Sequence, residues 1–235
     1  MNEIIKVYRR ELLKILYARS IKKQAIGWFV FLLMFGIAVP FSQAGFWLKE
    51  TSLLSLHFLF VPLMLTYTSV ADSFAGEKER RTMGGALAAG VSEDSLFFGK
   101  ALAGFIFSFT FYMIVVFIGI LTLNYYRYIS GTWQGFYVYS PPVLFTFVFI
   151  GAALTVFAVG SGVLVSLKVG SVKNAQLVGS LVYLVIGIPL MAGWLPVIFT
   201  WEFVIPVFAA LLAIDALVIL LAARLFRRAG IIAEG

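Results

Sequence analysis

The chain has 235 residues, of which 62% are hydrophobic and only 12% carry a charge, and its mean hydropathy is +1.01. This composition is typical of a chain that lies mostly in lipid, and it leaves no soluble stretch long enough for a catalytic domain. The absence of cysteine excludes disulfides, thiolate metal sites and cysteine nucleophiles. We therefore expect a single all-α integral membrane domain over residues 1–235.

The first segment, residues 1–23, is basic and periodic, and we interpret it as an amphipathic helix on the membrane surface. Apolar side chains recur at helical spacing on one face and basic side chains step by four along another: Ile5, Leu12 and Leu16, and Lys6, Arg10 and Lys14. The helix is either an anchor held by apolar burial and anionic lipids, or a lever that moves with the first span.

Apolar runs of the length that crosses a bilayer, about 20 residues, follow along the chain. We place six spans near residues 24–41, 53–73, 101–124, 142–167, 177–199 and 203–225. Lys and Arg are retained on the cytoplasmic side of short loops. With six spans, only Lys49 and Arg127 of the 18 Lys and Arg residues fall on the other side. We therefore expect both termini in the cytoplasm, and we attribute the net charge of +7 to topology rather than to nucleic-acid binding.

A charged island, residues 76–82, lies between the second and third spans. Glu77 and Arg81 are four apart in the favourable order, so the island is predicted to form a short helix with its own ion pairs. Ser92 is predicted to cap the helix that continues into the third span. A short surface helix with charges of both signs suits the docking of a soluble partner; the alternative is an ordinary solvated loop.

These residues resemble the membrane subunits of ABC-2 type transporters, the permeases of type V ABC exporters. The family pattern joins a Glu-x-x-x-Gly-Glu-Arg-Glu-Arg-Gly-Thr-Leu-Glu stretch, a Pro-Val-Ser-like turn and a Gly-Lys pair. The matching segments here are residues 75–83, 91–92 and 99–100. The chain departs from the pattern where Asp72 stands near an expected Glu, where Arg81 replaces a common Gly and where two glycines, 84–85, replace a Leu-Glu-like pair. The similarity is weaker over the rest of the chain.

The resemblance implies that residues 74–91 are a cytoplasmic coupling segment. In the family, a coupling helix here sits in a cleft of the ATPase subunit and transmits its closure to the spans. The residues that we carry over to this contact are Glu77, Glu79, Arg80, Arg81 and Thr82. The resemblance also implies a second permease subunit, identical or similar, because the family's pathway uses twelve spans.

No energy source is encoded in this chain. A P-loop requires Gly-Lys followed by Ser or Thr, but Gly99 and Lys100 are followed by Ala101. We therefore expect a non-catalytic subunit without a cofactor or metal, and ATP and Mg bound by the partner ATPase. The expected function is that of a permease, an exporter subunit of the plasma membrane that couples ATP hydrolysis elsewhere to substrate movement.

Asp215 falls near the middle of the last span, where an ionised carboxylate costs several kcal/mol unless it is paired or hydrated. It is either a structural hydrogen-bonding group or a proton or substrate site. The second interpretation favours another class of protein, a secondary carrier or channel that needs no ATPase.

A third class is a membrane anchor or assembly factor, for which the charged island would be only a docking handle. A neighbouring ATPase gene would favour the permease over both alternatives.

Two further features leave alternatives open. Proline and glycine interrupt the apolar stretch around spans five and six, at Pro189, Gly193, Pro196 and Pro206. They indicate either re-entrant half-helices, as the resemblance implies, or kinked span ends with interfacial tryptophans. Small residues at helical spacing allow close helix approach, at Gly104 and Ser108 and at Ala158, Gly162 and Ser166. They mark either internal packing or a dimer seam.

Overall fold

The computed structural model describes residues 2–16, 21–51, 54–80, 90–169, 171–181 and 199–233, which are helical with short connections and contain no strand. The helices are α1 (Asn2–Leu16), α2 (Ile21–Leu32), η1 (Leu33–Ala38), α3 (Val39–Ser42), α4 (Ala44–Trp47), α5 (Leu54–Glu79), α7 (Glu93–Ile129), α8 (Pro141–Phe145), η2 (Thr146–Ile150), α9 (Gly151–Lys168) and α11 (Trp201–Ala233). Residues 172–181 are also helical. The prediction of an all-α protein is confirmed for the part of the chain that the structure describes.

Three of the described helical segments are long and apolar enough to cross a membrane: Glu93–Ile129, Pro141–Lys168 and Trp201–Arg227. A shorter apolar helix covers Ile26–Ser42. These segments indicate a membrane protein. The number of six spans stays a prediction, and most of the fifth predicted span, with Pro189, Gly193 and Pro196, lies outside the described residues.

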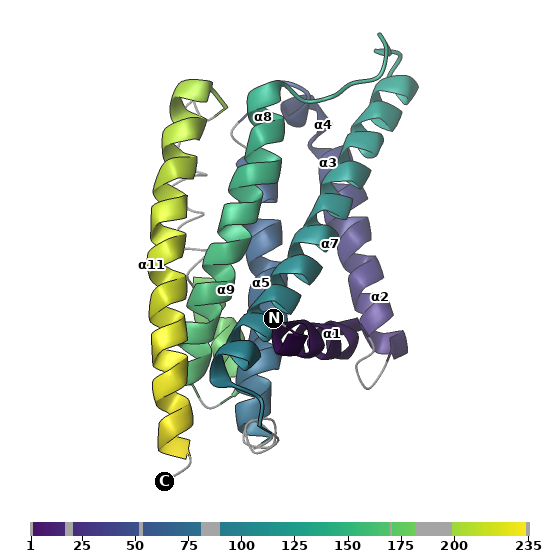
Figure 1. The fold of residues 1–235 in the computed structure, drawn as a ribbon. Coiled ribbons are helices and arrows are strands. Elements are labelled where there is room, and N and C mark those ends of the chain that lie inside the picture. The colour runs from purple at the N-terminus through teal and green to yellow at the C-terminus, as the bar shows by residue number, and fades with distance from the viewer. Residues whose placement is uncertain are drawn as a thin grey trace.

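The long helices stand side by side, and α1 lies across them near one end of the bundle (Figure 1). At that end α2 and α7 begin and α5, α9 and α11 finish, as the chain passes up and down the bundle. We call it the basic end, because basic residues follow α5 and α9 there, Arg80 after α5 and Lys173 after α9. The connection between α7 and α8 lies at the opposite end.

Small residues bring the central helices together. A side chain at Gly162 would lie 3.1 Å from Val70 of α5, and one at Gly160 would lie 2.7 Å from Val218 of α11. Ser108 is fully buried and shares a hydrogen bond with Ser69 of α5, 3.2 Å between the hydroxyl oxygens. The small-residue stripes therefore pack within the chain, which is the first of the two interpretations that the sequence allowed.

Two local predictions have clear outcomes. Ser92 caps α7 as expected, and its hydroxyl accepts the backbone N–H of Ser95 at 3.3 Å. The expectation of a separate short helix in the charged island is wrong for residues 76–79, because they form the last turn of α5. Glu and Lys favour helix, so nothing in this stretch ends the span helix earlier. Arg80 lies in the turn that follows, and residues 81–89 lie outside the described part.

The opposite end is closed by side chains that bind the segment leading into α8. The amide of Asn124 donates to the backbone carbonyl of Tyr137 at 2.9 Å and accepts the N–H of Tyr137 at 2.7 Å. The carboxylate of Glu50 accepts the N–H of Ser140, the residue that precedes α8, at 2.6 Å. We call Glu50, Asn124, Tyr137 and Ser140 the opposite-end cap.

Candidate functional site at the basic end

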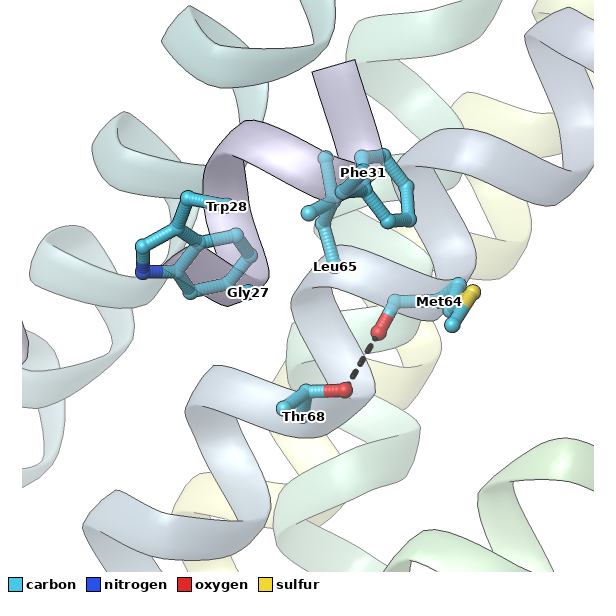
Figure 2. Close-up of a pocket in the computed structure, with 6 residues that line it drawn as sticks. All are labelled: Gly27, Trp28, Phe31, Met64, Leu65 and Thr68. Atoms are coloured by element: carbon cyan, nitrogen blue, oxygen red, sulfur yellow. Dashed lines mark hydrogen bonds between the residues drawn. The ribbon is translucent and has the colours of Figure 1, made fainter. Parts of the chain in front are cut away.

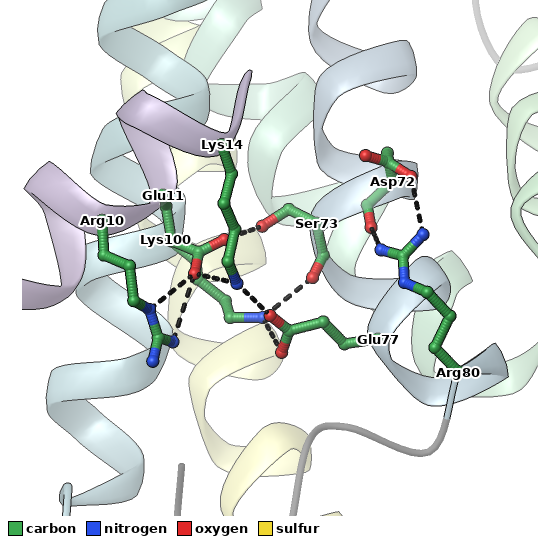
Figure 3. A network of polar contacts seen from close by, with 8 residues as sticks. All are labelled: Arg10, Glu11, Lys14, Asp72, Ser73, Glu77, Arg80 and Lys100. Atoms are coloured by element: carbon green, nitrogen blue, oxygen red, sulfur yellow. Dashed lines mark hydrogen bonds and ion pairs between the residues drawn. The ribbon is translucent and has the colours of Figure 1, made fainter. Parts of the chain in front are cut away.

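The last turn of α5 carries a carboxylate that points into the protein. Glu77 is only 6% exposed, and its side chain lies between α1 and α7 (Figure 3). One carboxylate oxygen accepts from the Lys14 amine of α1 at 2.8 Å, and the other accepts from the Lys100 amine of α7. A single side chain therefore joins three elements that are far apart in sequence.

Two further groups complete this cluster. The Lys14 amine also donates to Glu11 at 2.8 Å, and the Lys100 amine donates to the backbone carbonyl of Ser73 at 2.8 Å. The Ser73 hydroxyl donates to the second oxygen of Glu11 at 3.3 Å. We call Glu11, Lys14, Ser73, Glu77 and Lys100 the charge hub.

Lys100 is the most deeply buried cation among the described residues, with 1% of its surface exposed. Its amine lies 5.2 Å from the centre of the Phe74 ring, in addition to its bonds to Glu77 and Ser73. Removing one partner of a buried ion pair typically costs about 3–5 kcal/mol, because the other charge is left without compensation. The hub is therefore sensitive to the loss of either charge.

The pKa values of Glu77 and Lys14 are displaced. Burial alone would raise the pKa of Glu77, but the cations of Lys100 and Lys14 outweigh it and hold the pKa below its usual value. Burial alone would lower the pKa of Lys14, but the carboxylates of Glu11 and Glu77 outweigh it and hold the pKa above its usual value. Both groups are therefore charged at neutral pH.

A close helix contact brings α1 to the hub. A side chain at Gly99 of α7 would lie 2.6 Å from Val7 and 3.1 Å from the backbone carbonyl of Ile4. Only a glycine allows this approach without a shift of the helices. Glu3 adds a hydrogen bond from the Ser95 hydroxyl at 3.3 Å. The Gly-Lys pair at 99–100 thus provides both the space for α1 and the buried cation.

The other charges of the island bind neighbouring helix ends. The Lys78 amine donates to the Leu167 carbonyl at 2.9 Å, at the end of α9. A carboxylate oxygen of Glu79 accepts the N–H of Val172 at 3.1 Å, at the start of the next helical segment. These positions suit the negative carbonyl end of one helix and the positive amide end of another. The end of α5 is therefore fixed to its neighbours on several sides.

Arg80 lies at the surface of the basic end. Its guanidinium folds back along α5 to the Asp72 carboxylate, at 3.5 Å, and both side chains are more than half exposed. A side chain at Gly76 would lie 2.8 Å from that guanidinium, so the glycine leaves room for it. Glu79 is also exposed. The predicted contact residues Arg81 and Thr82 lie outside the described residues.

Asp215 lies in α11, away from the hub. It is 5% exposed, and neither of its carboxylate oxygens has a hydrogen-bond partner among the described residues. A buried carboxylate without partners is unusual, because burial of a polar group is costly unless it is hydrogen-bonded. No three acidic or His side chains in the described part could hold a metal ion.

Two grooves flank the exposed face of α5. The first, of about 240 Å³, is lined by Trp28 and Phe31 of α2 and by Met64 and Thr68 of α5 (Figure 2). The second, of about 280 Å³, lies between α5 and residues 172–181, and its polar lining comes from Thr68, Lys173, Gln176 and Ser180. Polar groups on this outer face favour contact with water or protein over contact with lipid tails.

Sequence reasoning missed three hub residues, Glu11, Lys14 and Ser73, and treated Lys100 only as part of a motif. One signal was present: Glu11 is the single acid between the basic residues Arg10 and Lys14. A lysine directly before an apolar run also indicates a need for a partner.

Comparisons of the chain with protein-family models, with curated proteins and with solved structures each gave no match. The resemblance to ABC-2 permeases therefore rests on the residues quoted from the sequence.

Proposed function

We propose that the chain is the permease subunit of an ATP-driven transporter of the ABC-2 type, most simply an exporter. A separate ATPase subunit would hydrolyse ATP. The chain would lie in the plasma membrane, with both termini and the basic end on the cytoplasmic side. The observation that carries the proposal is a contact between two separate segments that match the family pattern. Glu77, from the Gly-Glu stretch, binds Lys100, from the Gly-Lys pair, across 23 residues of sequence.

The hub supplies a physical route for coupling. A force applied to the segment after Arg80 acts on the last turn of α5. From there, Glu77 leads to α1 and α7, and Lys78 leads to the end of α9. Because interfaces of packed side chains shift between discrete arrangements rather than deform continuously, such a turn can pass on a movement of a docked partner.

We divide the predicted coupling residues into two groups. Glu77 is buried, so in this proposal it is a positioning residue inside the permease. Glu79 and Arg80 are exposed at the surface, and Arg81 and Thr82 follow directly in sequence. These four would form the ATPase contact, in which charged groups set register and specificity more than affinity.

A second permease subunit would pack on the exposed face of α5. The two grooves there share Met64 and Thr68, and the second brings polar side chains to this face. A partner subunit, or a water-filled path between two subunits, would bind Lys173 and Gln176, whereas the hydroxyls of Thr68 and Ser180 already donate to the backbone. Six spans in each subunit would give the twelve-span pathway.

The test is co-purification from native membranes in mild detergent. We expect an ATPase to accompany the wild-type chain. The informative variant is the swap of Asp72→Arg with Arg80→Asp, which keeps the ion pair but reverses the charges offered to a partner. The matched control is the swap of Asp94→Arg with Arg227→Asp. Asp94 and Arg227 form another exposed pair of the basic end, 2.6 Å between charged atoms, which joins α7 to α11.

We expect the ATPase to be lost from the first swap and retained by the control swap. Absence of an ATPase from the folded wild-type chain would overturn the permease proposal. If both swaps retain the ATPase, the ATPase remains a partner but the contact at Arg80 is refuted.

Asp215 favours a second candidate, a secondary carrier that moves protons or cations without ATP. Its buried carboxylate has no hydrogen-bond partner in the described part of the chain, which is the arrangement of a proton site. The discriminating experiment is flux into proteoliposomes that contain this chain alone. Proton-coupled flux that Asp215→Asn abolishes would support the carrier, whereas flux only with an added ATPase would exclude it.

A further inference from the structure

We propose that the exposed face of α1 is a binding surface for the headgroups of anionic phospholipids. We call this face the lipid-facing surface and define it by Ile5, Lys6, Arg9, Arg10, Leu13 and Leu16, all of which are exposed. The inference depends only on the membrane character of the chain and not on the proposed transport function.

The face of α1 that packs against the protein is a different one. Val7 and Glu11 are buried, with Val7 against Gly99 and Glu11 in the charge hub. By contrast, Ile5, Leu13 and Leu16 are 44–55% exposed. The helix thus has a second apolar stripe that the described protein does not cover. At 100° per residue, this stripe lies opposite the packed face, with Arg9 among its members and with Lys6 and Arg10 along one side of it.

An exposed face that combines apolar and basic side chains fits an interface helix. The packed face contacts the bundle, the second apolar stripe would contact acyl chains, and the basic side chains would reach the headgroup layer. The direction of α1 agrees, because it lies across the long helices and hence along the membrane plane (Figure 1).

The charges on the exposed side favour an anionic headgroup. Lys6 and Arg9 have no acidic partner among the described residues, and Arg10 shares the carboxylate of Glu11 with Lys14. Arg19, Lys22 and Lys23 follow in the sequence and make the N-terminal segment more basic. Guanidinium groups bind phosphate oxygens through paired hydrogen bonds, so Arg9 and Arg10 suit a phosphodiester.

The experiment compares lipids that are retained by the full chain. The protein is reconstituted with phosphatidylglycerol and phosphatidylcholine of the same acyl chains, extracted in mild detergent, and examined by native mass spectrometry. We expect the wild-type chain to retain phosphatidylglycerol preferentially. In the triple variant Lys6→Gln, Arg9→Gln, Arg10→Gln the preference should fall roughly fivefold for each cation removed.

The matched control neutralises three exposed cations of the basic end outside α1, with Lys168→Gln, Lys173→Gln and Arg224→Gln. We expect this control to keep the preference. Lack of a preference in the wild-type chain would overturn the proposal. So would an equal loss in both triple variants, because the effect would then reflect net charge alone.

A second measurement avoids neutralising the surface. Because the chain has no cysteine, a single Leu13→Cys can be labelled with a polarity-sensitive fluorophore, with Lys168→Cys as the control site. We expect a blue shift for the label at position 13, and not at 168, in vesicles that contain phosphatidylglycerol. A water-exposed label at position 13 in those vesicles, or its protection by a cytosolic protein instead, would contradict lipid binding.

Discussion

The two ends of the helix bundle are joined by different kinds of contact. At the basic end, Glu77 and Lys100 form a buried ion pair between α5 and α7, and Lys14 adds α1. At the opposite end, Asn124 binds the backbone of Tyr137, only 13 residues further along the chain. The first arrangement ties distant segments through a buried ion pair, whereas in the second the Asn124 amide and the Glu50 carboxylate bind neutral groups of the segment that leads into α8.

The difference affects what a substitution should do. A buried charge that loses its partner keeps its desolvation cost, so the basic end should respond strongly to single changes and recover in pairs. A lost neutral hydrogen bond costs less, and its effect should stay local.

The largest effect is expected for Lys100→Met, which removes the buried cation that Glu77 binds and leaves Lys14 as its remaining cation partner among the described residues. We expect a loss of about 3 kcal/mol in the free energy of unfolding, measured by denaturant titration in mild detergent. The double variant Lys100→Met with Glu77→Gln should lose less than the single variant. A single variant as stable as the wild type would contradict the buried pair.

Glu77→Gln is expected to cost about 3 kcal/mol at neutral pH, because the buried cation of Lys100 loses its carboxylate partner. The effect should depend on pH in one direction. Since the pKa of Glu77 lies below its ordinary value of 4.5 in the folded chain, the carboxylate stabilises fully above that pH. Its contribution is lost as the pH falls through the folded-state pKa. Unfolding of both chains as a function of pH would show the difference shrink in acid; a constant difference would contradict it.

Gly99→Ala should cost about 1–2 kcal/mol, because the added carbon would lie 2.6 Å from Val7. We expect α1 to move away from α7, so that a cysteine placed at Val7 reacts faster with a soluble thiol reagent. Removing the clash with Val7→Ala in the same chain should restore part of the stability. If the double variant is no more stable than Gly99→Ala, the close contact is not the cause.

Asn124→Ala should cost about 1–2 kcal/mol, since two hydrogen bonds to the Tyr137 backbone are lost. The change should increase proteolysis of the connection between α7 and α8 and leave the reactivity of a cysteine on α1 unchanged. A change in the reactivity of the cysteine on α1 would show that the two ends are coupled. It would contradict the claim that the loss of Asn124 acts only locally.

The smallest effect is expected for Arg227→Gln, which removes an exposed pair with Asp94 at the basic end. Both side chains are about half exposed, so the loss should be below about 1 kcal/mol despite the bidentate geometry. Raising the salt concentration should reduce the difference from the wild type in thermal unfolding. A loss as large as that of Lys100→Met would mean that burial does not decide the strength of these pairs.

Local signals in the sequence were enough for the helices and for one cap. Apolar length predicted the helical segments 142–167 and 203–225, and the structure places helices at Pro141–Lys168 and Trp201–Arg227. Ser92 was recognisable because a capping hydroxyl acts on the backbone of the next turn. Such features depend on neighbours in sequence and can be predicted from one chain.

The hub could not be predicted in the same way. Glu77 looked like a surface charge because its partners, Lys14 and Lys100, are 63 and 23 residues away. The packed face of α1 was also missed, since Val7 meets Gly99 only in the folded chain. Ile5 and Leu16, which the pattern assigned to the apolar face, are exposed instead. The number of spans and the partner ATPase stay predictions.

The central structural claim is that Glu77 holds α1 to the end of α5, and a double-mutant cycle tests it most directly. The cycle combines Lys14→Met and Glu77→Gln, and the free energy of unfolding is measured for all four chains. We predict a coupling energy of about 1 kcal/mol, because the two side chains are in direct contact at 2.8 Å. Additive effects of the two substitutions would contradict the claim.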